Sequence, residues 1–304
     1  MDLLAAFLEA TVRTATVLAF AALGEMLVQR SGVINIGLEG VIIAGAFGSL
    51  VGAGIGGLAG GVAAAILGGV AVAALFAVLV VVVRTDQIIT GTAVTLFALG
   101  LTGVLYRILF GAEGAALATP TLHPVVVPLV GRIPVFGPGI FVQPVPAYVL
   151  YALVPVVWWW LHRTRAGLAL RAVGENPEAA RAAGISPAKV RFWAILAGGA
   201  LGGMSGGTLV LAQAGTFAEG MSAGRGFIAI AIVALGRWHP VGAVLAALVF
   251  GAASAVQFLF QAMGWGVPYQ LFLALPYVLT LLALAGLAGR ARPPEALARG
   301  EVTG

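Results

Sequence analysis

The composition of this chain excludes a water-soluble fold. Of its 304 residues, 61% are hydrophobic, only 9% are charged and 44 are glycine, whereas charged residues make up about 25% of an ordinary soluble domain. The stretch Gly57–Val83 runs 27 residues without a charge, and a helix needs only about 20 residues to cross a bilayer. The absence of cysteine excludes disulfides, thiolate nucleophiles and cysteine-based metal sites. We predict an all-α, polytopic membrane protein with a single transmembrane domain over residues 1–304.

Uncharged stretches bounded by Arg, Pro or Gly-rich breaks predict about nine crossings, because backbone polar groups in lipid must be paired inside helices. In chain order these crossings lie near residues 11–29, 33–52, 58–83, 87–110, 146–161, 192–213, 226–237, 240–260 and 270–289. The seventh is too short for a full span at about 1.5 Å per residue. We therefore predict that it is a half-helix, continued by the irregular stretch Gly215–Gly224.

The basic residues set the expected orientation, because cytoplasmic loops of membrane proteins are enriched in Lys and Arg. With nine crossings and an outside N-terminus, 12 of the 16 cations face the cytoplasm, and the outside keeps Arg13, Arg107, Arg132 and Arg225. The first 15 residues lack the features of a cleaved secretory signal, so we expect them in the mature chain. We expect a multi-pass protein of the bacterial cell membrane, with its N-terminus outside and its C-terminus in the cytoplasm.

Two loops are long enough to carry a function. The outward loop, residues 111–144, holds six prolines and almost no charge, which favours an ordered lid on the membrane surface, with a plain spacer as the alternative. The inward loop, residues 162–191, holds six cations. Within it Asn176 fits an N-cap, Pro177 and Glu178 fit a first helical turn, and Gly184 fits the glycine after a helix end. We predict a short, exposed helix over residues 177–183.

Two glycine motifs and one lysine bear on enzyme chemistry. The only lysine, Lys189, is not part of a Gly-Lys-Ser/Thr sequence, so the chain lacks a Walker A loop for ATP. Gly52–Gly57 matches G-x-G-x-x-G, yet no strand precedes it, and we interpret it as a tight turn or close helix packing. Gly203–Gly207 matches G-x-S-x-G around Ser205, which leaves an intramembrane serine protease as an alternative. The favoured interpretation is a packing face of glycines spaced by four, at positions 199, 203 and 207.

Polar residues inside apolar stretches are the better functional signal, because burying them in a membrane is costly. One cluster comprises Glu25, Gln29, Arg30, Asn35 and Glu39, among glycines that permit unwound backbone of the kind that surrounds transport pathways. The alternative is structural: an ion pair of Arg30 with Glu39 or Glu25 that pins two helix ends. A second cluster comprises Gln87, Thr90, Thr92 and Thr95, although Thr hydroxyls can also bond their own helix.

Three segments together resemble a known family. They are the Arg-Ser-Gly-Val-Ile-Asn-Ile-Gly-Leu-Glu-Gly sequence of residues 30–40, the Thr-Asp-Gln-Ile-Ile-Thr-Gly sequence of residues 85–91, and the cytoplasmic segment 171–185. They resemble the permease subunits of bacterial ABC importers, in the ribose and branched-chain amino acid permease superfamily. The first segment looks most like the nucleoside permeases of the guanosine and uridine type. The resemblance extends over most of the chain.

The resemblance implies a transport subunit rather than an enzyme, with a small neutral polar solute as substrate. A nucleoside is the first expectation, and a simple sugar or a branched-chain amino acid is the alternative; an ion-coupled secondary transporter is a more remote one. The implied partners are ATP-binding subunits that use ATP and Mg, a second permease subunit of different sequence, and an extracytoplasmic substrate-binding protein. No cofactor, metal or nucleic acid is expected on this chain.

The resemblance and the polar clusters together indicate candidate site residues. For the substrate pathway we expect Asn35, Glu39, Gln87, Thr90 and Thr95. For the contact with the ATPase we expect the capped cytoplasmic helix and its borders, namely Glu175, Asn176, Pro177, Glu178, Arg181 and Gly184.

Overall fold

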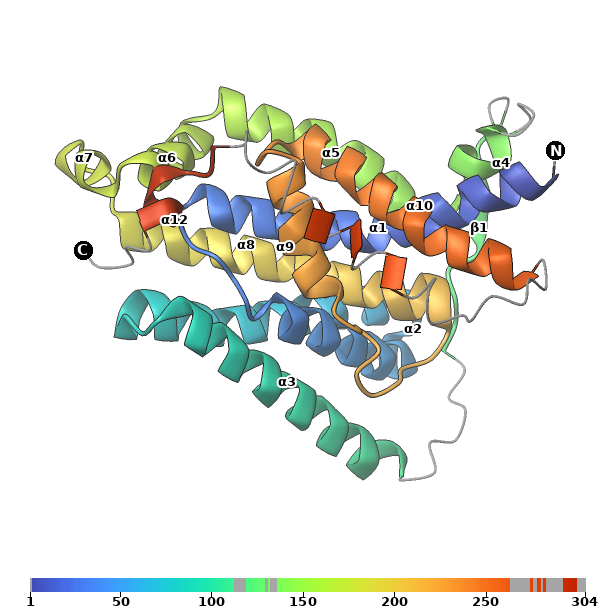
Figure 1. The fold of residues 1–304 in the computed structure, drawn as a ribbon. Coiled ribbons are helices and arrows are strands. Elements are labelled where there is room, and N and C mark those ends of the chain that lie inside the picture. Colours follow the sequence, from blue (N-terminus) through green and yellow to red (C-terminus); the bar gives the residue numbers. More distant parts are fainter. Residues whose placement is uncertain are drawn as a thin grey trace.

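The computed structural model describes residues 2–111, 119–128, 131, 136–262, 274–275, 278–279, 281–282 and 292–299. In these residues the chain forms a bundle of helices with one small sheet (Figure 1). The long helices are α1 (Asp2–Arg30), α2 (Leu38–Ala77), α3 (Gln87–Phe110), α5 (Val145–Arg163), α8 (Pro187–Thr208) and α10 (Pro240–Ala262). The short ones are α4 (Phe136–Phe141), α6 (Arg165–Glu175), α7 (Pro177–Ala182), α9 (Arg225–Leu235) and α12 (Glu295–Arg299).

Two π-helical turns and two strands complete the described part of the fold. The turns η1 (Val78–Val83) and η3 (Leu209–Ala214) extend α2 and α8. The strands β1 (Pro124–Val126) and β2 (Val142–Pro144) pair antiparallel, with Val125 opposite Gln143. Both strands come from the predicted outward loop, and that loop is fixed to η3, since the Leu122 amide donates to the Leu211 carbonyl at 2.7 Å. Its described part is therefore held against η3, and its role as a lid stays a prediction.

Five segments of the described chain are long and apolar enough to cross a membrane. They are Leu3–Arg30, Leu38–Val83, Gln87–Phe110, Val145–Arg163 and Pro187–Ala214, and two shorter apolar helices are Arg225–Leu235 and Pro240–Val256. The all-α, polytopic prediction is therefore confirmed. The short α9 and the non-helical residues before it match the predicted half-helix, and the crossing predicted at 270–289 lies largely outside the described residues.

Several predicted boundaries were wrong, and one helix was not predicted. The crossing expected from residue 33 begins at Leu38, because the chain is not helical over residues 31–37 and Gly32 has a φ of 85°. The crossing expected from residue 192 begins at Pro187, where Ser186 accepts a hydrogen bond from the Lys189 amide. The inward loop also holds α6, which we did not predict; Thr164 caps it by accepting from the Gly167 amide at 3.1 Å.

The motif at Gly52–Gly57 is a helical hairpin turn. Gly56 and Gly57 leave the helical conformation, and Gly57 has a φ of 60°, which favours glycine. The two halves of α2 then pack closely, since a Cβ atom on Gly52 would lie 2.4 Å from the Gly60 carbonyl oxygen. The interpretation as a tight turn with close packing is confirmed.

The glycine face of α8 packs against α2 almost backbone to backbone. A Cβ atom on Gly203 would lie 2.3 Å from the Ala65 carbonyl oxygen, and one on Gly199 would lie 2.3 Å from Cβ of Ala73. Ser205 lies on the same helix with no exposed surface, and its hydroxyl donates to the Val17 carbonyl at 2.7 Å. The close glycine contacts confirm the packing interpretation, and the buried serine joins α8 to α1 through its hydrogen bond.

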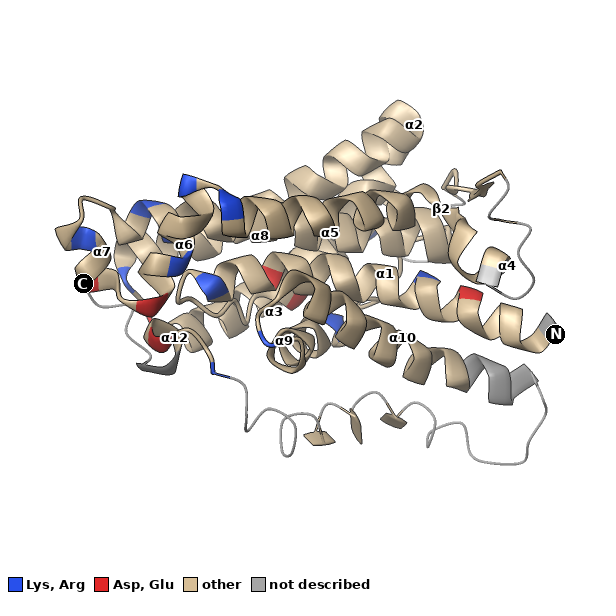
Figure 2. Cartoon of the chain, turned by 90° about the horizontal axis from the view of Figure 1, so that it is seen from above, with Lys and Arg blue, Asp and Glu red and all other residues tan. Residues whose placement is uncertain are grey.

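Charge divides the bundle into two ends. Lys and Arg gather at the end that holds α6, α7 and α12 (Figure 2), which we call the basic end. The other end holds β1 and β2, and we call it the strand end. Two non-helical segments turn back from these ends (Figure 1): residues 31–37 run from the basic end to the start of α2, and residues 215–224 run from the strand end to the start of α9.

The close approach of α2 and α8 gives a stability prediction. Gly203→Ala should destabilise the fold by about 1–3 kcal/mol, because the added methyl group has backbone atoms as its nearest neighbours and they cannot move aside. Thermal unfolding of the purified protein in detergent measures the effect. The matched control is Gly100→Ala in α3, where no atom lies within 4 Å of the new Cβ. The control should unfold at or above the wild-type temperature; equal loss in both variants would contradict the packing argument.

Candidate functional site

Polar side chains on the buried face of α3 fix this helix to the non-helical segment 31–37. The Gln87 side-chain oxygen accepts from the Ile34 amide at 3.0 Å, and the Thr95 hydroxyl donates to the Ile36 carbonyl at 3.4 Å. Between them Gly91 packs so closely that a Cβ atom there would lie 2.7 Å from Cβ of Ile36. Thr90 is buried beside them, and its hydroxyl donates to that of Thr85 at 2.8 Å. We call this contact the α3 seam.

A buried hydrogen-bond network holds the same segment on its other side. Glu25 in α1 has no exposed surface, and its Oε1 accepts from the Gln29 side chain at 2.9 Å and from the Asn35 amide at 3.0 Å. Gln29 in turn accepts from the Trp238 indole N–H at 2.7 Å. Arg191 of α8 donates to the Ser31 carbonyl at 3.3 Å. Segment 31–37 is thus held from three helices.

Two groups in this network have no hydrogen-bond partner among the described residues: Oε2 of Glu25 and the side-chain amide of Asn35. Asn35 is 1% exposed, yet neither its side-chain oxygen nor its side-chain nitrogen has a hydrogen-bond partner among the described residues. Buried polar groups are paired in the great majority of cases. Asn35 therefore offers an NH₂ donor group and a carbonyl acceptor for which the described chain supplies no partner.

Glu39 does not form the ion pair with Arg30 that the sequence offered as an alternative. Its two carboxylate oxygens accept from the backbone amides of Gly224 and Gly226, each at 2.7 Å. Arg30 instead donates through Nε to the Trp238 carbonyl at 2.8 Å. The expected ion pair of Arg30 with Glu39 or Glu25 was wrong. Glu39 instead accepts hydrogen bonds from backbone amides at the start of α9, which lack partners within their own helix. Glu25 accepts from polar groups of α1 and of segment 31–37.

The sequence-predicted pathway residues therefore meet around one short stretch of chain. Asn35 lies within segment 31–37, Glu39 follows it in the first turn of α2, and Gln87 and Thr95 contact it from α3. All are buried in this conformation. Sequence reasoning missed Trp238, which no motif marked and which the turn after α9 brings to Gln29.

The capped helix at the basic end forms as predicted. The Asn176 side chain accepts from the Ala179 amide at 2.9 Å, Pro177 opens α7, and Gly184 has a φ of 81°. The helix ends at Ala182 rather than 183. Glu175, Glu178 and Arg181 are exposed, and α7 projects from the bundle (Figure 1). The preceding α6 is fixed inside, since a Cβ atom on Gly174 would lie 2.1 Å from the Arg30 carbonyl oxygen.

At the strand end an ion pair joins the far end of α3 to residues 215–224. Arg107 donates to both carboxylate oxygens of Glu219, at 2.8 and 2.9 Å. The hydrogen bond from this guanidinium, together with its charge, lowers the pKa of Glu219. Phe217 of the same stretch packs edge-on against Phe47 of α2, with ring centroids 5.5 Å apart. The loop before α9 is therefore anchored to both α2 and α3.

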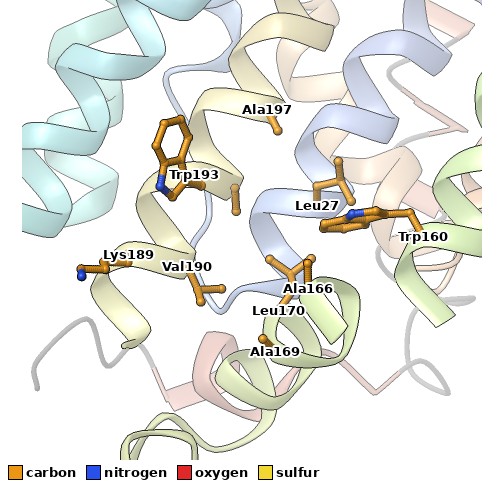
Figure 3. Close-up of a pocket in the computed structure, with 10 residues that line it drawn as sticks. Leu27, Trp160, Ala166, Ala169, Leu170, Lys189, Val190, Trp193 and Ala197 are labelled. Carbon is orange, nitrogen blue, oxygen red and sulfur yellow. The ribbon is translucent and has the colours of Figure 1, made fainter. Parts of the chain in front are cut away.

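A separate cavity of about 360 Å³ lies near the basic end, between α1, α5, α6 and α8 (Figure 3). Its walls are mainly apolar, including Leu27, Trp160, Leu170 and Trp193, and the Lys189 side chain at its edge points away from it. Such a lining offers few hydrogen bonds to a polar solute. We therefore place the candidate site at segment 31–39 and the α3 seam.

Known proteins of similar sequence indicate the family of this chain. The chain is 35% identical to the guanosine ABC transporter permease protein NupQ of Bacillus subtilis, over 97% of this chain and 96% of that protein. It is 36% identical to the nucleoside ABC transporter permease protein NupC of Lactococcus lactis, over 92% of each chain. It is also 36% identical to a putative glucose ABC transporter permease protein of Haloferax volcanii, over 86% of this chain and 80% of that protein.

No solved structure matches the chain significantly. Residues 7–284 match the family described as branched-chain amino acid transport system / permease component. With the near full-length relatives, this match shows that the chain belongs to that family and is the permease subunit of an ABC transporter.

Proposed function

We propose that this permease subunit imports a nucleoside, driven by separate ATP-binding subunits. The observation that carries the proposal is the similarity to guanosine and nucleoside permeases over more than nine-tenths of the chain. The chemistry of the site supports it. Asn35, Gln87, Thr90 and Thr95 are uncharged donors and acceptors, and both carboxylates nearby are already hydrogen-bonded within the protein. A neutral, hydroxyl-bearing solute suits such a lining better than an ion.

The proposal includes partners and an orientation. A second permease subunit completes the path, a substrate-binding protein delivers the solute outside, and ATP-binding subunits dock at α7. The basic end then faces the cytoplasm, in keeping with the enrichment of Lys and Arg in cytoplasmic loops. The α7 helix supports this role, since it is exposed, rigidly capped and connected to the bundle through α6.

A chain of close contacts offers a route from the ATPase to the site. Movement of α7 is passed to α6, whose Gly174 lies against the Arg30 carbonyl and within reach of Gly32. Gly32 begins segment 31–37, which carries Asn35 and the hydrogen bonds to α3. ATP-driven motion can shift the transport equilibrium only if α7 contacts its partner differently in the two states. In this mechanism the α3 seam opens and closes around the solute.

Uptake in proteoliposomes tests the class of transporter. We expect guanosine uptake only when the ATP-binding subunits, the second permease and the binding protein are present together with ATP. Uptake by the purified chain under an ion gradient alone would indicate a secondary transporter. Uptake of glucose or a branched-chain amino acid in preference to guanosine would reassign the substrate while leaving the transporter class intact.

Asn35 tests the pathway. Asn35→Ala should leave the amount of assembled protein near wild type, because its amide has no partner among the described residues, while the KM for uptake should rise several-fold, since one hydrogen bond is worth about 0.5–1.5 kcal/mol. Gln87→Ala is the contrasting variant: it removes the acceptor of the Ile34 amide and should lower assembly. An unchanged KM in Asn35→Ala would remove Asn35 from the pathway.

Gly184 tests the coupling role of α7. Gly184→Val should reduce uptake and the stimulation of ATP hydrolysis by loaded binding protein, because a left-handed backbone costs a non-glycine residue about 1–2 kcal/mol. No atom lies within 4 Å of a Cβ atom there, so the effect comes from backbone strain and not from a clash. Single changes of Glu178 or Arg181 to Ala should act more weakly, since exposed ion pairs contribute only about 0–1 kcal/mol.

Labelling of single cysteines from either side of the membrane supplies the control for this experiment. Single cysteines at positions 178 and 123, in a chain without native cysteine, should be labelled only from the cytoplasm and only from outside, respectively, in wild-type and Gly184→Val backgrounds alike. Wild-type uptake and stimulated ATPase activity in Gly184→Val would make residues 175–185 a passive connector. Reversed labelling would overturn the proposed orientation.

A further inference from the structure

The helices α2 and α9 begin side by side inside the bundle. The segments that lead to them come from opposite ends (Figure 1), and α9 then crosses the bundle at a steep angle to α1 and α8, so that it is seen nearly end-on in Figure 2. Their first turns touch, since a Cβ atom on Gly226 would lie 2.5 Å from the Glu39 amide nitrogen. Each start exposes unpaired N–H groups and carries roughly half a positive charge. Placing two such ends together requires a negative group.

The α9 helix has no cap of its own that could supply this group. Its N-cap residue is Gly224, which has a φ of 78° and no side chain to accept a hydrogen bond. The only charged residue in its first turn is Arg225, which donates to the carbonyls of Met221 and Ser222 at 2.8 and 3.1 Å. A cap for α9 must therefore come from elsewhere in the chain.

Glu39 supplies it from the first turn of α2. One carboxylate oxygen accepts from the Gly224 amide and the other from the Gly226 amide, both at 2.7 Å, and the residue is 5% exposed. Hydrogen bonds from backbone amides to an ionised carboxylate are roughly twice as strong as neutral ones. A single side chain thus joins two helices and, through them, the two non-helical segments.

We propose that Glu39 is an internal anion that occupies an anion-binding site at the start of α9. In this role it is a positioning residue, which holds residues 215–224 and α9 against segment 31–39. Its removal leaves two inward-facing amides in a space that matches the lost CH₂–COO⁻ group, and a small carboxylate such as acetate is the ligand that fits.

Rescue by acetate tests the proposal on the purified full-length chain in detergent. Glu39→Ala should unfold at a lower temperature than wild type, and sodium acetate should raise that temperature in a saturable manner, while equal concentrations of sodium chloride should not. The matched control is Glu219→Ala, which also removes a carboxylate but one that is 40% exposed and bonded to Arg107. Acetate should shift neither this control nor wild type. No shift of Glu39→Ala beyond that in chloride would overturn the proposal.

A second measurement covers the case in which Glu39→Ala cannot be recovered. Glu39→Gln keeps one acceptor oxygen, so hydrogen exchange of peptides covering residues 222–228 should become about tenfold faster than in wild type, equivalent to losing one charged hydrogen bond. Unchanged exchange there would also overturn the proposal. Both measurements need no transported solute, so a failure of guanosine uptake alone would refute the proposed function and leave this inference standing.

Discussion

The structure depends on one requirement: backbone that is not helical inside a membrane protein must still have its N–H and C=O groups paired. Segment 31–37 and residues 215–224 both interrupt the helical pattern within the bundle. Side chains from distant helices meet the need, as Gln87 accepts from Ile34, Glu25 from Asn35, and Glu39 from Gly224 and Gly226. The polar residues that mark this chain as a transporter are, in this conformation, the partners of its irregular backbone.

In the proposed transport mechanism, the same residues hold the fold and admit a solute because the α3 seam alternates between a closed and an open arrangement. In the closed arrangement the α3 seam is filled by protein hydrogen bonds, while the side-chain amide of Asn35 has no partner among the described residues. When the seam opens, Gln87 and Thr95 must exchange their backbone partners for solute or water. A hydrogen bond exchanged for another changes the free energy little, whereas a buried group left without any partner costs about 1–3 kcal/mol. A polar solute therefore stabilises an open seam that an apolar one would not.

The predictions that held depend on short stretches of sequence. The cap of α7 spans Asn176 to Gly184, the turn at Gly57 lies within six residues of Gly52, and the glycine face of α8 repeats every four positions. Each is local, so sequence spacing carries the geometry. The role of Asn35, Gln87, Thr90 and Thr95 in solute binding stays a prediction, since the structure places them together without a solute.

The predictions that failed depend on contacts between distant parts of the chain. Arg30 and Glu39 are nine residues apart and opposite in charge, which made an ion pair one of two interpretations of this cluster. The partners of Glu39 are instead backbone amides of glycines 185 and 187 residues away, and glycine carries no side-chain signal of an unpaired N–H group. Trp238 was not predicted as a site residue because its partner, Gln29, is 209 residues away in the sequence. The start of α2 was set too early because the mainly apolar residues 33–36, which include Asn35, fit a helix equally well on composition alone.

The way α3 is held also defines how it can move. Close contact at Gly91 clamps the helix near its start, and the exposed pair of Arg107 with Glu219 holds it near its end. Between these points the helix rises about 24 Å at 1.5 Å per residue. As a lever pivoting at Gly91, it would carry Arg107 by about 2 Å for a tilt of only about 5°, beyond the distance range of a hydrogen bond that starts near 2.8 Å. A rotation too small to disturb the glycine contact is thus enough to release the far end.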